Sequence, residues 1–173
     1  SLLDLEALLN KVARLIPERF GFPCVHLFSV HPNRRQIIYE AGSGGSSQDA
    51  EGYALNLDSQ EGIIPEVARS GRTILANDVS LEPLYSPSPI PLHETRSELC
   101  VPLVYDNRVV GVLDIQSGKV NAFNEDDLLL FEALADTIAA AIHNADVYRS
   151  ERWRRQVADS LREVAGLLSS DVS

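Results

Sequence analysis

The spacing of hydrophobic residues predicts a helix at each end of this chain and strands between them. At residues 2–16 the apolar positions recur every three or four residues, and we expect Pro17 and Gly21 to end this helix. Residues 125–148 have the same helical spacing. This second segment opens with three acidic residues, which favour a helix N-terminus through its dipole.

Short apolar or alternating segments between the two helices are typical of strands. They are residues 24–30, 36–41, 53–57, 73–76, 96–104 and 109–114. Residues 59–70 predict a short helix with Asp58 or Ser59 as its N-cap and Gly71 as its end. A long connection with four prolines, residues 77–95, precedes the fifth strand, and loops of this length often cover a site.

This order of elements predicts an α+β fold. We expect a six-stranded antiparallel sheet with the N- and C-terminal helices packed on one face, because each helix must bury its apolar stripe.

The last 25 residues predict a separate helical segment suited to pairing with another helix. Its apolar positions are spaced by four, four, three and four residues; they are Trp153, Val157, Leu161, Val164 and Leu168. Between Tyr148 and Trp153 the spacing slips to five, which predicts a stutter or a hinge. We therefore divide the chain into a domain at 1–148 and a linking helix at 149–173, with a homodimer through the terminal helices.

Charge and composition exclude several function classes. The net charge of −10 argues against a nucleic-acid partner and against an anionic membrane surface. No apolar run approaches the roughly 20 residues that a bilayer crossing needs, and no secretion signal is recognisable. The chain has no Met, which predicts a piece of a longer polypeptide. Two cysteines without metal-ligand spacing predict buried, reduced thiols, no bound metal and a cytoplasmic location.

Four segments in order resemble the GAF domain, a sensory module of signalling proteins. They are residues 62–72, residues 77–85, the hairpin segments 96–103 and 109–114, and the closing segment 123–148. The resemblance implies a domain of a sensor histidine kinase, cyclase, phosphodiesterase or transcription regulator. Residues 149–173 resemble the signalling helix that joins such domains to their neighbours.

The ligand signatures of the family are incomplete here. Lys119, Phe123 and Asp127 fit the frame of the cyclic-nucleotide signature, but Gly118 and Leu128 replace its Asn and Glu. Neither cysteine precedes a histidine, as a bilin attachment requires, and the two strand cysteines do not resemble the paired thiols of free methionine sulfoxide reductases.

Candidate ligand-binding residues lie near the predicted central hairpin. Asp114 and Gln116 share a strand face with Val112, so an inward orientation would place a carboxylate and an amide among apolar side chains. The other candidates are Arg96, Ser97 and Asp78, which could converge there, and His93, whose loop should overhang the sheet. Alternatively, these polar groups face solvent or anchor loop ends.

The sequence therefore predicts a non-catalytic GAF-type domain, without a cofactor, that senses a small molecule or relays a signal within a two-component or related system. Two alternatives stay open: a scaffold or dimerisation module with no ligand, and a cyclic-nucleotide-binding domain.

Overall fold

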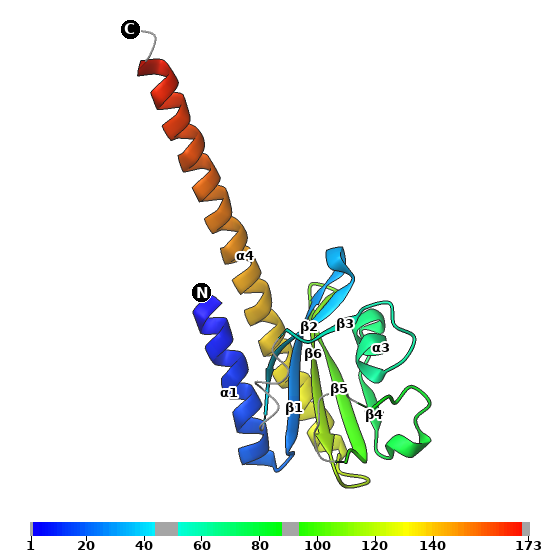
Figure 1. The fold of residues 1–173 in the computed structure, drawn as a ribbon. Helices are drawn as coiled ribbons and strands as arrows, with labels where there is room; N and C mark the ends of the chain where they lie inside the picture. The colour runs from blue at the N-terminus through cyan, green and yellow to red at the C-terminus, as the bar shows by residue number, and fades with distance from the viewer. Residues whose placement is uncertain (1, 44–51, 88–93, 171–173) are drawn as a thin grey trace.

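A computed structural model describes residues 2–43, 52–87 and 94–170, which are organised around a six-stranded antiparallel sheet (Figure 1). The strands are β1 (Cys24–His31), β2 (Gln36–Gly42), β3 (Ala54–Asn56), β4 (Ile74–Ala76), β5 (Ser97–Tyr105) and β6 (Arg108–Ser117). Their order across the sheet is β3-β2-β1-β6-β5-β4. The predicted α+β class and strand number are confirmed.

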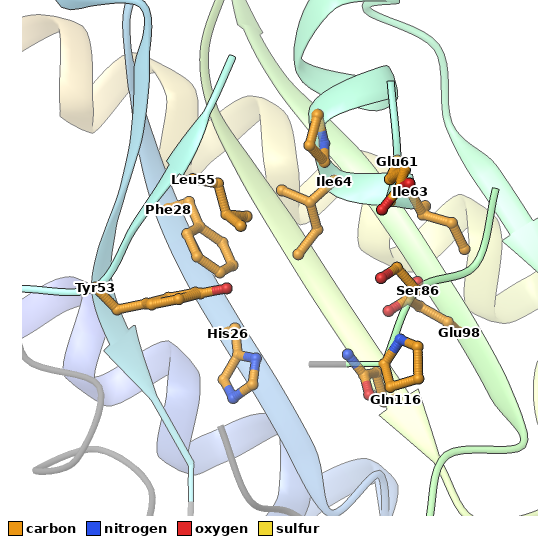
Figure 2. Close-up of a pocket in the computed structure, with 13 residues that line it drawn as sticks. His26, Phe28, Tyr53, Leu55, Glu61, Ile63, Ile64, Ser86, Glu98 and Gln116 are labelled. Carbon is orange, nitrogen blue, oxygen red and sulfur yellow. The ribbon is translucent and has the colours of Figure 1, made fainter. Parts of the chain in front are cut away.

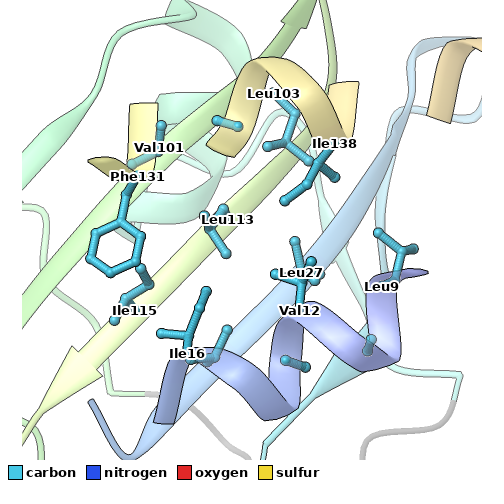
Figure 3. Packing of buried hydrophobic residues seen from close by; sticks show 14 of the residues in the cluster. Leu9, Val12, Ile16, Leu27, Val101, Leu103, Leu113, Ile115, Phe131 and Ile138 are labelled. Atoms are coloured by element: carbon cyan, nitrogen blue, oxygen red, sulfur yellow. The ribbon is translucent and has the colours of Figure 1, made fainter. Parts of the chain in front are cut away.

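The two terminal helices, α1 (Leu2–Phe20) and α4 (Glu125–Ser170), cover the same face of the sheet, as predicted. Figure 3 shows their apolar side chains meeting those of the central strands. The residues labelled there are Leu9, Val12, Ile16, Leu27, Val101, Leu103, Leu113, Ile115, Phe131 and Ile138, all at most 7% exposed. Burial of these side chains is the main stabilisation of the domain, at about 25 cal/mol per Å² of apolar surface.

Of the two predicted stops of α1, Pro17 is wrong and Gly21 is confirmed, because the helix continues to Phe20. A proline near the C-terminal end removes one amide donor, while the fully buried Ile16 holds this turn against the sheet. Gly21 ends the helix, with a φ of 76° and its N–H donating to the Pro17 carbonyl.

The short helix α3 (Ile63–Ser70) covers the opposite face of the sheet, next to β5 and β6. The predicted N-cap at Asp58 or Ser59 is wrong. The Asp58 carboxylate instead forms an ion pair with Arg35, and the chain enters the helix at Gly62 with a φ of 100°. Gly71 ends the helix in the left-handed conformation, as predicted.

The β5–β6 hairpin turns through Asp106 and Asn107, which both have positive φ and thereby match the twist of the strands. A β-bulge between Leu103 and Val104 then shifts the register of the whole hairpin by one residue. Beside the bulge, a Cβ atom on Gly111 would lie 2.5 Å from the Phe28 carbonyl oxygen, so only glycine fits.

The helix α4 is one continuous element, which contradicts a hinge between Tyr148 and Trp153, while the alternative prediction of a stutter stays a prediction. Asn124 and Asp127 cap its start reciprocally, each side chain accepting the other's N–H at 2.9 Å. The last buried residue is Ala145, and beyond it the helix leaves the domain (Figure 1).

By length and composition alone, α4 is apolar enough to cross a membrane. This differs from the sequence analysis, which found no apolar segment long enough for a bilayer crossing. The buried third of its most apolar window packs on the sheet, as in the core helix of a soluble domain, so this property is weak evidence for a membrane contact.

Candidate functional site

A cavity of about 110 Å³ lies between the sheet and the segment that leads into α3 (Figure 2). It is lined by His26, Phe28, Tyr53, Leu55, Glu61, Gly62, Ile63, Ile64, Pro65, Ser86, Pro87, Glu98 and Gln116. In Figure 2 the aromatic rings of Phe28 and Tyr53 lie across the cavity from Glu98 and Gln116. The cavity therefore has an aromatic side and a polar side.

The polar side is built by the register of the three central strands. Gln116 on β6 lies opposite Cys24 on β1 and Glu98 on β5. One step along, Asp114 lies opposite His26 and Cys100. These six side chains share one sheet face, and each is at most 4% exposed.

Asp114 is the least satisfied of these buried groups. Its Oδ2 accepts a hydrogen bond of 2.7 Å from Gln116 Nε2, whose own Oε1 accepts from Thr95 Oγ1 at 2.6 Å. Its Oδ1 accepts from no amide or hydroxyl group of the described residues, although Asp114 is 0% exposed. The donors beside the carboxylate are the Glu98 carboxyl group, when it is protonated, and the Cys100 thiol.

Glu98 and Asp114 form a pair of buried carboxyl groups. Burial raises the pKa of Asp114 from 3.8 to about 6, against the opposing effects of Gln116, Glu98 and Cys100 beside it. Burial and the neighbouring Asp114 charge raise the pKa of Glu98 well above its usual value. Burial therefore favours the protonated form of both carboxyl groups, and two carboxyl groups this close resist carrying two negative charges.

The other titratable groups of this face are neutral. Burial lowers the pKa of His26 to about 4, so its imidazole carries no charge at neutral pH. Burial and the nearby carboxyl groups raise the pKa of both thiols, Cys24 and Cys100. A thiol in this state is a poor nucleophile.

Of the six predicted ligand-binding residues, only Gln116 lines the cavity among the described residues; Asp114 is fully buried beside it and accepts its hydrogen bond. Ser97 lies on the other sheet face, where its hydroxyl donates to the Lys119 carbonyl at 2.7 Å and anchors the loop end. Arg96 is exposed and pairs with Glu94, and Asp78 caps a 3-10 turn by accepting from Ser80. His93 lies outside the described residues.

Glu98 and His26 are the buried polar residues of the cavity that sequence reasoning missed as site residues. The pattern of β5 conceals Glu98, because the strand is buried on both faces from Ser97 to Leu103. Cross-strand pairing with Gln116 would have identified it, had the hairpin register been known.

The remnant of the cyclic-nucleotide signature has structural roles. Phe123 is 4% exposed and stacks on Phe22 with ring centroids 4.6 Å apart, while Asp127 caps α4. Within residues 2–43, 52–87 and 94–170, no group of three His, Cys, Asp or Glu side chains is placed to hold a metal ion.

Asn77 connects the end of β4 to the segment that enters α4. Its side-chain amide donates to the Phe123 carbonyl at 3.2 Å, its Oδ1 accepts from the Phe123 N–H, and its own carbonyl accepts from Asn121. The end of β4 and the segment that enters α4 are therefore joined by main-chain and side-chain hydrogen bonds.

We expect Asn77→Ala to lower the free energy of unfolding by about 1–2 kcal/mol, because two main-chain groups of Phe123 lose their partner. Urea denaturation followed by circular dichroism measures the change. Asn144→Ala, at an exposed position of α4, is the matched control and should change stability by less than about 0.5 kcal/mol. Equal effects of the two variants would contradict the role of Asn77.

Comparison with known proteins identifies both the fold and the family. The family described as "GAF domain" matches residues 3–143. The GAF domain of a phosphoenolpyruvate-protein phosphotransferase from Coxiella burnetii has a TM-score of 0.75 and 23% identity, covering 84% of this chain and 86% of that one. Free methionine-R-sulfoxide reductase from Neisseria meningitidis, solved with its substrate, has a TM-score of 0.67 and 24% identity, covering 84% and 81%. At these identities the two structures show the fold alone.

A curated relative is the DNA-binding transcriptional activator HyfR of Escherichia coli strain K12. It is 25% identical over 152 residues, which cover 86% of this chain. The chain spans 23% of the length of that protein.

Proposed function

The chain belongs to the GAF domain family, whose match covers most of its length, and on this basis we propose that it is a non-catalytic domain that senses a small molecule or relays a signal within a larger signalling protein. The proposed GAF domain is residues 1–148 and the proposed signalling helix is residues 149–173. A cytoplasmic location and coupling through dimerising terminal helices belong to the same proposal.

The observation that carries the proposal is the course of α4. Its first half is buried against the sheet through Phe131, Ile138 and Ile142, and its second half projects as an unbroken helix with an exposed apolar stripe. The exposed fractions of Trp153, Val157, Leu161, Val164 and Leu168 are 66%, 39%, 65%, 54% and 66%. A stripe of this spacing is typical of helices that pair.

Contacts between the sheet and α4 support a relay. The Tyr105 ring at the end of β5 stacks on His143 of α4, with centroids 4.1 Å apart, and Asn77 holds the start of the helix. A ligand that changes the cavity wall can bias the position of α4 only through its differential affinity for two arrangements.

The neutral thiols and imidazole favour a binding role over a catalytic one. A free methionine sulfoxide reductase shares the fold, and such chemistry requires a reactive thiolate. Both cysteines of this chain are buried with raised pKa values. Incubation with free methionine sulfoxide and dithiothreitol, followed by assay for methionine, tests this point, and turnover would contradict it.

We expect the double variant Leu161→Ala/Val164→Ala to weaken self-association by about tenfold or more, because it removes two apolar residues from the proposed helix pair. Sedimentation equilibrium of the 173-residue chain measures the dissociation constant. Asp159→Ala is the control, since helical spacing places it on the opposite side of α4.

Two results of this experiment would contradict coupling through the tail: a wild-type chain that stays monomeric at high concentration, or a double variant that associates like the wild type. Native mass spectrometry of the same samples tests the competing scaffold function, which predicts a dimer with no retained small molecule.

A further inference from the structure

The strongest unassigned feature of the molecule is an open groove of about 700 Å³ at the C-terminal end of α3. The β1–β2 turn and the β5–β6 turn form its other borders, and Figure 1 shows both turns at the same end of the sheet. We propose that this surface, named the arginine groove, docks an acidic peptide segment of a partner protein. The inference goes beyond the proposed function and does not depend on it.

The arginine groove is separate from the cavity, because α3 lies between them. Gly62 and Pro65, at the start of α3, line the cavity. Ala68 and Gly71, at its end, line the groove. No described residue lines both hollows, so a ligand in the cavity and a partner in the groove would contact different surfaces.

The first argument is the charge of the groove. Its lining includes three arginines and, among the described residues, no Asp or Glu. The three bordering segments, residues 32–35, 69–72 and 105–108, hold five arginines and one acidic residue. The whole chain instead has 15 basic and 25 acidic side chains. A basic surface on an acidic chain favours encounter with acidic partners.

The second argument is that the arginines keep N–H donors for a partner. Arg108 is exposed, and its guanidinium has no partner among the described residues. Arg35 pairs with Asp58 through Nε and Nη2, which leaves Nη1 available to a second carboxylate. Arg69 is held by Glu66 and two main-chain carbonyls, so it mainly fixes the wall. The end of α3 carries partial negative charge, so the partner's acidic groups should lie at Arg35 and Arg108 instead.

The third argument is that the borders of the groove are held in place before a partner arrives. Arg35 has a φ of 54°, and its N–H donates to the Pro32 carbonyl at 3.1 Å. At the end of α3, the Gly71 N–H donates to the Val67 carbonyl at 2.9 Å. A surface that is already ordered loses less conformational entropy on binding.

The floor of the groove is apolar and decides between a peptide and a small anion. Leu57 and Ala68 are buried there, and Val30, Val104 and Val109 are half-buried. Ion pairs between exposed groups contribute little alone, so useful affinity requires an apolar side chain on this floor as well. An acidic segment with one Leu or Phe supplies both contacts, whereas a small phosphate-bearing anion would leave the floor uncovered.

Fluorescence anisotropy with the 173-residue chain and labelled peptides tests the proposal. The probes are peptides of about nine residues with Leu or Phe at the centre and Asp or Glu elsewhere. One control set has Lys in place of the acidic residues, and another has Gly in place of the central apolar residue. Sodium pyrophosphate, added as a competitor, represents a small anion.

At least one acidic peptide should bind, and an increase of NaCl from about 50 mM to about 300 mM should weaken binding severalfold. Arg108→Glu should weaken binding by about tenfold or more, because it replaces an attraction with a repulsion. Arg108→Gln should weaken binding less, and it serves if the first variant does not fold. Arg14→Glu makes the same charge change at an exposed position of α1 and should bind like the wild type.

The proposal is overturned if no acidic peptide binds, or if the peptides bind the Arg108 variants as tightly as the wild type. Equal binding of the Gly-containing peptides, or their displacement by pyrophosphate at low concentration, would assign the groove to small anions instead. Weaker self-association of Arg108→Glu in sedimentation equilibrium would assign it to a second copy. None of these results bears on the cavity or on the Leu161 and Val164 variant, so the proposed function is tested separately.

Discussion

Asp114→Asn is expected to raise the free energy of unfolding by about 3 kcal/mol at about pH 7.5 and to change it little at about pH 4. Burial raises the pKa of the Asp114 carboxyl from 3.8 to about 6 in the folded state. A difference of about two pKa units corresponds to about 3 kcal/mol of preference for the protonated form. The amide of asparagine has a similar shape and carries no charge to bury.

The direction of the pH dependence follows from proton binding. Between about pH 4 and pH 6 the folded state holds a proton on Asp114 that the unfolded state has lost, so wild-type stability falls as pH rises through this window. Above about pH 6 the Asp114 carboxyl is ionised in the folded state, and the full cost of burying its charge lowers the free energy of unfolding. Burial also raises the pKa of Glu98, so this carboxyl group changes wild-type stability in the same direction.

Urea denaturation at a series of pH values, followed by far-ultraviolet circular dichroism, measures the effect. The fluorescence of Trp153 is a poor probe of the domain, because this residue is 66% exposed on the tail. Asp106→Asn is the matched control: Asp106 is exposed in the hairpin turn, its φ is positive, and asparagine tolerates that conformation. A variant less stable than the wild type at pH 7.5, or a difference that does not vary with pH, would contradict the prediction.

Phe131→Ala should lower the free energy of unfolding by about 3–5 kcal/mol, the range for removal of a fully buried aromatic ring. Phe131 is 0% exposed and lies at the junction of α4, α1 and the sheet. Its ring contacts Phe20 and Phe22 edge-on, each with a centroid separation of 5.8 Å. The substitution would therefore leave a cavity where the two terminal helices meet.

Chemical denaturation of this variant is best compared with Leu129→Ala. Leu129 lies two residues away on the same helix and is 68% exposed, so its truncation should change stability by about 0.5 kcal/mol or less. Similar losses in the two variants would show that α4 is not packed on the sheet through Phe131.

The elements of the fold were predictable because their patterns are local. Short apolar or alternating segments identified the strands, and the reciprocal cap at Asn124 and Asp127 lies at the acidic segment that sequence alone marks as a helix start. The start of α3 was misplaced because Asp58, a good N-cap by type, pairs instead with Arg35 from a distant turn. That competition between a local cap and a non-local ion pair is invisible in the local sequence.

The site was only half predictable, and the β-bulge at Leu103 is the physical reason. If the pairing next to the two-residue turn continued along the hairpin without a bulge, Ser97 would lie opposite Gln116 and on the cavity face. The extra residue shifts the pairing by one, so Glu98 takes that place and Ser97 turns to the helical face. A register continued from the turn alone would therefore place a serine where the structure has a carboxylate.

The unbroken course of α4 constrains length as well as composition. The helix has no break between Phe131 and Leu168, which lie about 55 Å apart along its axis. A rotation of the helix at Phe131 is therefore transmitted to Leu168. Each residue inserted or deleted between these positions would rotate the apolar stripe by about 100° about the helix axis, whereas seven would restore its phase almost completely. The number of residues in this segment is therefore expected to tolerate change only by amounts close to whole helical turns, such as about 7, 11 or 18 residues.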